Sequence, residues 1–484
     1  MTQGLPIFEE LRPAPSAWSV FNRLRCLDGV VFFDSAMRHP KLGRYSFVAA
    51  DPFETLTLVS GPDEDPYGRD PFTMLRRRIA DHPAESVPGL PPFQGGAAGL
   101  FSYDLCRYLE RLPAQGRSTF QYPEMVVGLY DWVVAFDHSE GRAWVISHGF
   151  PEDDVTSQRR RARQRIEMVL DLLRPNSSTG ISVDPPTEET RCEPDDIAEL
   201  HDRTVPVDVR EGLRSNFTKG DYLTAVERAI DAVYAGDIFQ VNLSQQLYFP
   251  ARISSVELYR RLRECNPSTF AAYFSPVGQP FQVASASPER FLKVTRDGIV
   301  ETRPIKGTRP RGQLAEQDRF SRDELRESAK DRSENVMIVD LLRNDLSRVC
   351  RPGSVIVPNL FGVETYPSIH HLVSVVEGRL LESADALDLL MAAFPGGSIT
   401  GAPKIRAQEI IADLEPDTRG PYCGSLGYIG FDGSMDTSIL IRTVTTTRGW
   451  LQFPVGGGIV ADSSPKREYE ETLHKARGIL WALT

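Results

Sequence analysis

Apolar residues follow a strand-like pattern in the first part of the chain and a mixed pattern in the rest. In residues 19–59 and 94–149, short apolar runs such as Val30-Val-Phe-Phe33 and Trp132-Val-Val-Ala-Phe136 are separated by Gly, Pro and Asp. Such runs predict β-strands joined by turns, in a largely antiparallel arrangement. Residues 153–173 are charged and have helical spacing. The pattern predicts an N-terminal β-rich domain over residues 1–173.

The composition changes in the middle of the chain. Residues 174–215 are rich in Pro, Ser, Thr and acidic residues and contain few large apolar side chains. This composition is typical of a linker or flexible excursion, because the segment has little apolar surface to bury. Residues 216–484 then form a predicted second domain. There we expect helices in 221–235, 321–349, 384–394 and 465–483, and strands in 282–287, 427–431, 439–446 and 451–455.

The composition and net charge of the chain limit the kinds of molecule that the protein is expected to bind. With 484 residues, 41% of them hydrophobic, the chain can bury one composite core or two ordinary ones. A formal net charge of -11 disfavours nucleic acids and anionic membranes. No apolar stretch approaches the roughly 18 residues of a membrane span, the first residues lack a signal-peptide pattern, and the cysteines lack disulfide or zinc spacing. We expect a cytoplasmic protein that acts on small molecules, with no nucleic-acid and no membrane partner.

Two predicted helices carry carboxylates three residues apart. Ser321-Arg-Asp-Glu324 has the pattern of a capping box that opens a helix through Leu342, and Glu334 falls on its apolar stripe beside Asp331. A second helix begins at Ser464-Pro465 and presents Glu468, Glu471 and Lys475 on one face. Oxygen ligands without His or Cys suit Mg²⁺, and ordinary surface charge is the alternative.

Two glycine-containing loops could present bare backbone to an anion. Val455-Gly-Gly-Gly458-Ile-Val-Ala461 matches a dinucleotide fingerprint in form, but the helix that should follow at once begins only at Pro465. Pro395-Gly-Gly-Ser-Ile-Thr400-Gly-Ala-Pro-Lys404 has Ala402 where a P-loop needs Lys. Both loops could instead direct N–H groups at a carboxylate, or serve only as tight turns.

The second predicted domain contains several separate motifs. They are Gly236-Asp-Ile-Phe-Gln240-Val-Asn-Leu-Ser244, Ser287-Pro-Glu289-Arg-Phe, Arg303-Pro-Ile-Lys306-Gly-Thr308-Arg-Pro-Arg311, Glu334-Asn-Val-Met-Ile-Val-Asp-Leu-Leu-Arg-Asn-Asp345 and Tyr422-Cys-Gly-Ser-Leu-Gly-Tyr428. In their order and spacing these motifs are similar to those of the chorismate-utilising enzymes, namely anthranilate synthase component I, aminodeoxychorismate synthase component I, and the isochorismate and salicylate synthases. This resemblance implies an α+β fold of antiparallel sheets packed as a β-sandwich with helices outside, and it implies that residues 216–484 are the chorismate-binding catalytic domain.

Two positions separate the chemistries within this family. Family members that add water carry Lys where this chain has Gln240, because water needs a general base and ammonia does not. Anthranilate synthases have Ala in the place of Lys306, whereas Pro-Ile-Lys-Gly-Thr resembles the branch that makes 4-amino-4-deoxychorismate. The family mechanism then implies that neutral Lys306 adds at C2 of chorismate while the 4-hydroxyl leaves, and that ammonia then adds at C4 while the lysine leaves C2. Glu289 is implied as the acid that protonates the departing hydroxyl.

The resemblance also implies the remaining site residues. Glu334 and Glu471 would bind Mg²⁺ directly and Asp331 and Glu468 through water, although Asp331 stands where some relatives have Glu. Tyr422, Arg442 and backbone N–H groups around Gly456 and Gly458 would hold the enolpyruvyl carboxylate. His371, Gly307, Thr308 and Lys475 would complete the pocket, with His371 either a proton carrier or a satisfied core histidine.

The predicted partner is a separate glutamine amidotransferase subunit, because no cysteine lies in the setting of a glutaminase nucleophile. Its ammonia would convert chorismate at C4 on the route to para-aminobenzoate and folate. The alternatives are anthranilate synthase component I, which Lys306 disfavours, and an inactive homologue, which predicts gaps in the motifs. Asn266-Pro-Ser-Thr-Phe270 departs from the tryptophan-feedback motif of anthranilate synthase, while a structural tryptophan near Ser35 stays open.

Overall fold

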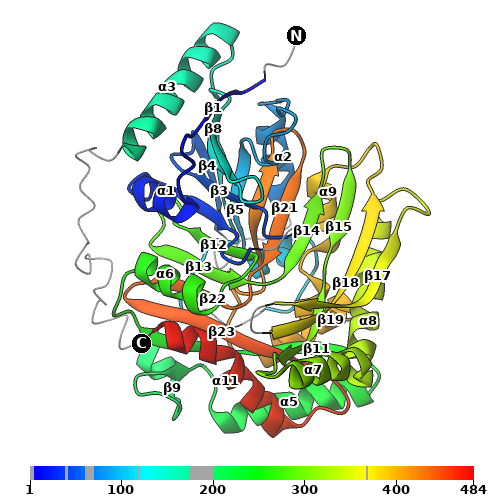
Figure 1. Cartoon of the computed structure of the whole chain (residues 1–484). Coiled ribbons are helices and arrows are strands. Elements are labelled where there is room, and N and C mark those ends of the chain that lie inside the picture. Colours follow the sequence, from blue (N-terminus) through cyan, green and yellow to red (C-terminus); the bar gives the residue numbers. More distant parts are fainter. Residues whose placement is uncertain are drawn as a thin grey trace.

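Strands from both ends of the sequence pair with one another in two antiparallel sheets, shown in Figure 1. The structure is a computed structural model that describes residues 5–38, 42–59, 70–114, 116, 119–174, 200–366 and 369–483. Most of the predicted linker, residues 175–199, therefore lies outside the described residues. Residues 200–215 of the same range contribute two short strands to a sheet edge.

The first sheet has 13 strands among the described residues, and its middle joins the two predicted domains. Phe33 pairs with Ala272, so an N-terminal strand lies directly beside a C-terminal one. In sheet order the strands are β1 (Ile7–Glu10), β8 (Arg142–Ser147), β7 (Trp132–Asp137), β3 (Tyr45–Ala49), β2 (Val31–Asp34), β12 (Phe270–Phe274), β13 (Phe281–Ser287), β22 (Thr443–Thr447), β23 (Trp450–Ile459), β11 (Gln240–Pro250), β10 (Arg214–Ser215) and β9 (Val205–Pro206), with β19 (Gly401–Ala402) paired to β11.

The second sheet has 10 strands in the described part of the chain and is shared in the same way. Gly99 pairs with Gly427, which joins the two halves of the sequence again. The strands in order are β16 (Ile305–Pro310), β18 (Ile369–Arg379), β15 (Ile299–Thr302), β14 (Arg290–Val294), β21 (Met435–Ile439), β20 (Ser425–Gly430), β5 (Gly96–Phe101), β6 (Met125–Tyr130) and β4 (Glu54–Leu58), with β17 (Ile356–Thr365) paired to β18.

The sheets pack face to face over an apolar layer, and helices cover their outer faces (Figure 1). Phe47 and Phe281 of the first sheet meet Leu100 and Tyr428 of the second in this layer. Burial of apolar surface contributes about 25 cal/mol per Å², so this layer is a main source of stability. The helices are α1 (Ala17–Leu24), α2 (Pro71–Ala80), α3 (Val155–Leu173), α5 (Lys219–Tyr234), α6 (Ser255–Cys265), α7 (Ala315–Glu327), α8 (Ala329–Ser347), α9 (Ala386–Ala393), α10 (Lys404–Leu414) and α11 (Pro465–Ala482), with 3-10 turns η2 (Tyr103–Tyr108) and η4 (Gly397–Ile399).

Two element predictions were wrong at their boundaries. Ser321 does not open a helix but lies inside α7, where Glu324 is taken by Arg309 of β16 at 2.7 and 2.9 Å. The helix that carries Asp331 begins instead after Ser328, whose hydroxyl accepts the Asp331 N–H. The predicted strand 439–446 is interrupted at residues 440–442, because the chain crosses there from the second sheet to the first.

None of the described helices combines the length and the apolar character that crossing a membrane requires.

Candidate active site

Glu289 and Arg442 lie where the chain passes from one sheet to the other. Glu289 joins β13 to β14, and Arg442 joins β21 to β22. The two crossings are hydrogen-bonded together, from Ala286 N–H to the Arg442 carbonyl at 3.1 Å and from Ile439 N–H to the Glu289 carbonyl at 3.1 Å. Arg442 has a φ of 51°, a left-handed conformation that non-glycine residues adopt rarely and that often marks functional sites. Both predicted side chains are thus fixed by rigid sheet ends.

Burial sets the protonation of Glu289. Its side chain is nearly inaccessible to water, and burial raises its pKa to about 7. Hydrogen bonds from the Ser398 side chain and the Ile305 backbone, with the charges of Lys306 and Arg442, oppose this rise. A carboxyl group with a pKa near neutrality can both give and accept a proton, as a general acid requires.

Lys306 lies on β16 with its amine directed at a turn. Its Nζ donates to the Ser398 carbonyl at 3.4 Å. Burial lowers the pKa of Lys306, while the charges of Glu334 and Glu289 oppose that change. Since only the neutral amine is a nucleophile, a lowered pKa favours the role predicted for Lys306.

The residues after Lys306 connect β16 to its neighbours. Gly307 has a φ of 82°, and a methyl group there would stand 2.8 Å from Leu325 and 2.9 Å from Asp331, so only glycine fits. Thr308 hydrogen-bonds through its hydroxyl to Nδ1 of His371 on β18 at 2.8 Å. Burial lowers the pKa of His371 to about 3, so the ring is neutral at physiological pH. Its Nε2 is buried and has no hydrogen-bond partner among the described residues.

A fully buried ion pair supports the wall that carries Tyr422. Arg419 contacts Glu415 at 2.7 and 2.9 Å, and donates to the carbonyls of Ile399 at 2.9 Å and Asn242 at 2.8 Å. Its guanidinium also lies 5.9 Å from the ring centre of Tyr422. This pair fixes the η4 turn, and with it the Ser398 carbonyl that binds Lys306.

The four predicted metal ligands lie on α8 and α11 and interact electrostatically. Burial raises the pKa of Glu334, and the charges of Asp331 and Glu471 add to the rise. Burial also raises the pKa of Glu468, with Glu471 adding to it. Burial acts in the same direction on Glu471, but Lys475 at 2.8 Å and other lysines outweigh it and lower its pKa. The two helices therefore direct carboxylates toward a common region.

The carboxylate oxygens of α8 and α11 decide whether the region between these helices can bind a cation. Glu468 and Glu471 both approach Gly457 of β23, where a methyl group would stand 3.3 and 3.6 Å from their oxygens. Lys330 lies 3.8 Å from Glu334, so each helix places a lysine near a carboxylate. Within the described ranges, no three acidic, His or Cys side chains stand close enough together to form a metal site. The oxygen-only donor set fits Mg²⁺ in its chemistry.

Strands β23 and β11 carry the remaining predicted site residues, Gly456, Gly458 and Gln240. Gly456 and Gly458 of β23 pair with Ser244 and Asn242 of β11, and Lys475 donates to the Gly456 carbonyl at 2.7 Å. Gln240 begins β11, fully buried, and its amide lies against Gly458. Sheet pairing, helix packing and the charge interactions described above thus connect the predicted catalytic, binding and metal residues.

Three residues with contacts to this group were not predicted. Ser398 contacts both Glu289 and Lys306, and Arg419 fixes its turn. Asn242 has a buried oxygen without a partner among the described residues. Ser398 and Asn242 stand inside motifs that the sequence singled out, so position in a motif was an available signal. Arg419 offered no such signal.

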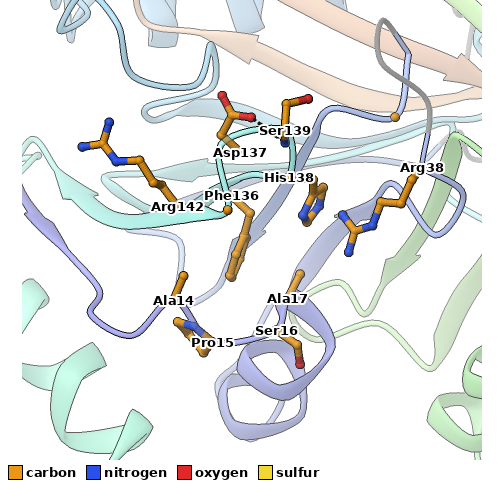
Figure 2. Close-up of a pocket in the computed structure, with 12 residues that line it drawn as sticks. Ala14, Pro15, Ser16, Ala17, Arg38, Phe136, Asp137, His138, Ser139 and Arg142 are labelled. Carbon is orange, nitrogen blue, oxygen red and sulfur yellow. Dashed lines mark hydrogen bonds between the residues drawn. The ribbon is translucent and has the colours of Figure 1, made fainter.

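Two cavities in the described part of the chain do not include the predicted catalytic or metal residues. Ser35 lines one of about 100 Å³ between the sheets, together with Tyr45, Phe47 and Tyr428; tryptophan binding there stays a prediction. Another, of about 690 Å³, lies between the start of α1 and the β7–β8 turn. Figure 2 shows the Arg38 side chain extending toward the ring of His138 in the lining of this cavity. It contains none of the predicted site residues.

Comparison with known proteins defines the class of this protein. Residues 33–481 match the family described as chorismate binding enzyme. The chain belongs to this family of enzymes, and its likeness to a solved anthranilate synthase component I structure confirms the predicted α+β sandwich.

Individual relatives carry two different names. The chain is 40% identical over 452 residues to aminodeoxychorismate synthase component 1 of Klebsiella aerogenes, which covers 91% of this chain and 90% of that protein. It is 38% identical over 458 residues to anthranilate synthase component 1 of Thermus thermophilus, covering 94% and 92%. The crystal structure of anthranilate synthase component I from Streptococcus pneumoniae has a TM-score of 0.74 at 30% identity, covering 92% and 93%.

Proposed function

We propose that this chain aminates chorismate at C4 with ammonia to give 4-amino-4-deoxychorismate. The observation that carries the proposal is Lys306, a desolvated amine beside a carboxyl group whose pKa is about 7. Similarity to aminodeoxychorismate synthase component 1 from several bacteria supports the same reaction.

The proposed reaction proceeds by two displacements that balance. The Lys306 lone pair forms a bond to C2, the two ring double bonds shift, and the C4–O bond breaks as Glu289 gives its proton, which releases water. Ammonia then forms a bond to C4, the double bonds shift back, and the C2–N bond breaks to return neutral Lys306. The new C4 ammonium group can return a proton to Glu289, which restores the starting state.

The other predicted residues act in binding. Arg442 and the backbone around Gly456 and Gly458 would hold the enolpyruvyl carboxylate, with Tyr422 against it. Neutral His371 can donate or accept a hydrogen bond through Nε2, which lacks a partner among the described residues. Glu334 and Glu471, with Asp331 and Glu468 around them, would hold Mg²⁺. When bound, the ion would neutralise the ring carboxylate of chorismate.

Anthranilate synthase component I is the competing function, because relatives of similar identity carry that name. Lys306 argues against it, because ammonia can reach anthranilate by a single direct attack at C2, which needs no nucleophilic lysine. Incubation of the protein with chorismate, Mg²⁺ and ammonium, followed by chromatographic identification of the product, separates the two. We expect 4-amino-4-deoxychorismate without pyruvate. Fluorescent anthranilate with released pyruvate would overturn the proposal.

The proposed ammonia source is a separate glutamine amidotransferase subunit. Relatives named as a component 1 support such a partner. Addition of that subunit should let glutamine replace ammonium salts in the assay. A cytoplasmic location, the route to folate and the domain ranges stay predictions.

A further inference from the structure

Strand β11 carries two side-chain amides with polar atoms that have no hydrogen-bond partner among the described residues. They are Oε1 and Nε2 of Gln240 and Oδ1 of Asn242. Gln240 is 0% exposed and Asn242 is 8% exposed. A buried polar atom without a hydrogen bond has lost its hydration without compensation, and native structures contain few such atoms. Two neighbouring amides of this kind indicate a polar ligand.

The geometry of β11 and β23 brings these amides together. Residues 240 and 242 share one face of β11, because alternate residues of a strand point to the same side. Asn242 pairs with Gly458, which has no side chain to fill the space opposite. A methyl group at Gly458 would stand 2.7 Å from Nε2 of Gln240. The Gln240 amide therefore lies over the bare backbone of Gly458, opposite Asn242.

The same backbone connects the amides to the nucleophilic lysine. The Asn242 N–H donates to the Thr400 carbonyl at 2.7 Å, and the Asn242 carbonyl accepts from Arg419 at 2.8 Å. Two residues earlier in that turn, the Ser398 carbonyl accepts from Lys306. One rigid turn thus holds both Asn242 and Lys306.

We propose that the carbonyl oxygens of Gln240 and Asn242 bind the ammonia that attacks C4, an inference that rests on the proposed function. Ammonia has three N–H donors and one lone pair. Two amide oxygens can take two donors and leave the lone pair free for the bond to C4. Because amide oxygens carry no net charge, they select the ammonium ion less strongly than carboxylates do, and so leave the nucleophilic form available.

The test measures initial rates against free ammonia for Asn242→Leu, which keeps the side-chain volume and removes the acceptor. We expect the KM for ammonia to rise at least tenfold, with the KM for chorismate within twofold and kcat at saturating ammonia within threefold. Thr446→Val is the matched control, since it removes another buried oxygen without a described partner from β22. Its kinetic constants should equal those of wild type.

Asn242→Asp provides a second measurement in case the Leu variant folds poorly. Its carboxylate should bind ammonium, which lowers the KM for total ammonium and reduces kcat at least tenfold because the lone pair is protonated. An unchanged KM for ammonia in either folded variant overturns the ammonia site, as does a change confined to the KM for chorismate. If wild type itself forms no 4-amino-4-deoxychorismate, the proposed function fails instead, so the two failures are distinguishable.

Discussion

Lys306 and Lys404 are both partly buried, and desolvation lowers the pKa of both, but they are held differently. Lys404 forms an ion pair with Asp345 at 2.6 Å and donates to the Ala393 carbonyl at 2.7 Å. Lys306 has a 3.4 Å contact to a carbonyl, and no carboxylate pairs with it among the described residues. A directly paired lysine stays a cation and joins two elements, here α8 and α10. A lysine without such a partner can lose its proton at lower cost, which is the property a nucleophile needs.

Lys306→Ala tests whether Lys306 is the nucleophile and should have the largest effect on product formation. We expect 4-amino-4-deoxychorismate formation to fall by about 10⁴-fold or more, because the first displacement loses its nucleophile. Chorismate binding, measured by calorimetry with Mg²⁺ present, should persist. Lys219→Ala, an exposed lysine at the start of α5, is the control. Product formation at the wild-type rate would remove the covalent role of Lys306.

Glu289→Gln tests the acid that faces Lys306. The amide keeps the shape of the side chain but cannot protonate the leaving hydroxyl, so kcat should fall about 10²- to 10³-fold. The pH profile of wild-type kcat/KM combines two opposite dependences, because Glu289 must be protonated to act and Lys306 must be neutral. The descending limb near pH 7 belongs to Glu289 and should be absent from the residual activity of the variant. A variant with the same descending limb as wild type would contradict this role.

Lys404→Met tests whether the ion pair between Lys404 and Asp345 stabilises the fold. It leaves Asp345 buried without its cation, so the free energy of unfolding should fall by about 3 kcal/mol in urea titrations. The double variant Lys404→Met with Asp345→Asn should recover part of this loss, because no buried charge remains. Loss of turnover at unchanged stability would mean that Lys404 belongs to the reactive group after all.

Glu289 also makes stability depend on pH, with the smallest expected effect. Its folded pKa of about 7 lies above the ordinary value of 4.5. Stability is therefore full below about pH 4.5 and declines as pH rises through 7, since the unfolded chain ionises first. Glu289→Gln should remove this decline. Its unfolding free energy should exceed that of wild type by on the order of 2–3 kcal/mol at pH 8, and by nearly nothing at pH 4.5. If the variant and wild type differed in unfolding free energy by the same amount at pH 8 and pH 4.5, the raised pKa of Glu289 would be refuted.

The sequence predicted helices well where periodicity alone determines them, as in α5 and α11. It failed where long-range contacts decide. The Ser321 and Glu324 pair has a capping pattern, but Arg309 from β16 takes Glu324, and Ser328-x-x-Asp331 has the same pattern seven residues on. The crossing at Arg442 could not be predicted, because the residues on both sides of it, Ile439–Ile441 and Thr443–Thr446, are strand formers and read as one strand. The sandwich itself came from family resemblance, because strand patterns do not fix which strands pair.

The pairing of β2 with β12 and of β5 with β20 has a consequence for synthesis of the chain. Neither sheet can close until strands beyond residue 425 have left the ribosome. Until then the emerging N-terminal half presents open, apolar strand edges, which are prone to aggregation. Such long sequence separations between partners also slow folding. We therefore expect early-truncated chains to need chaperones for solubility, and yields to depend on translation speed and temperature.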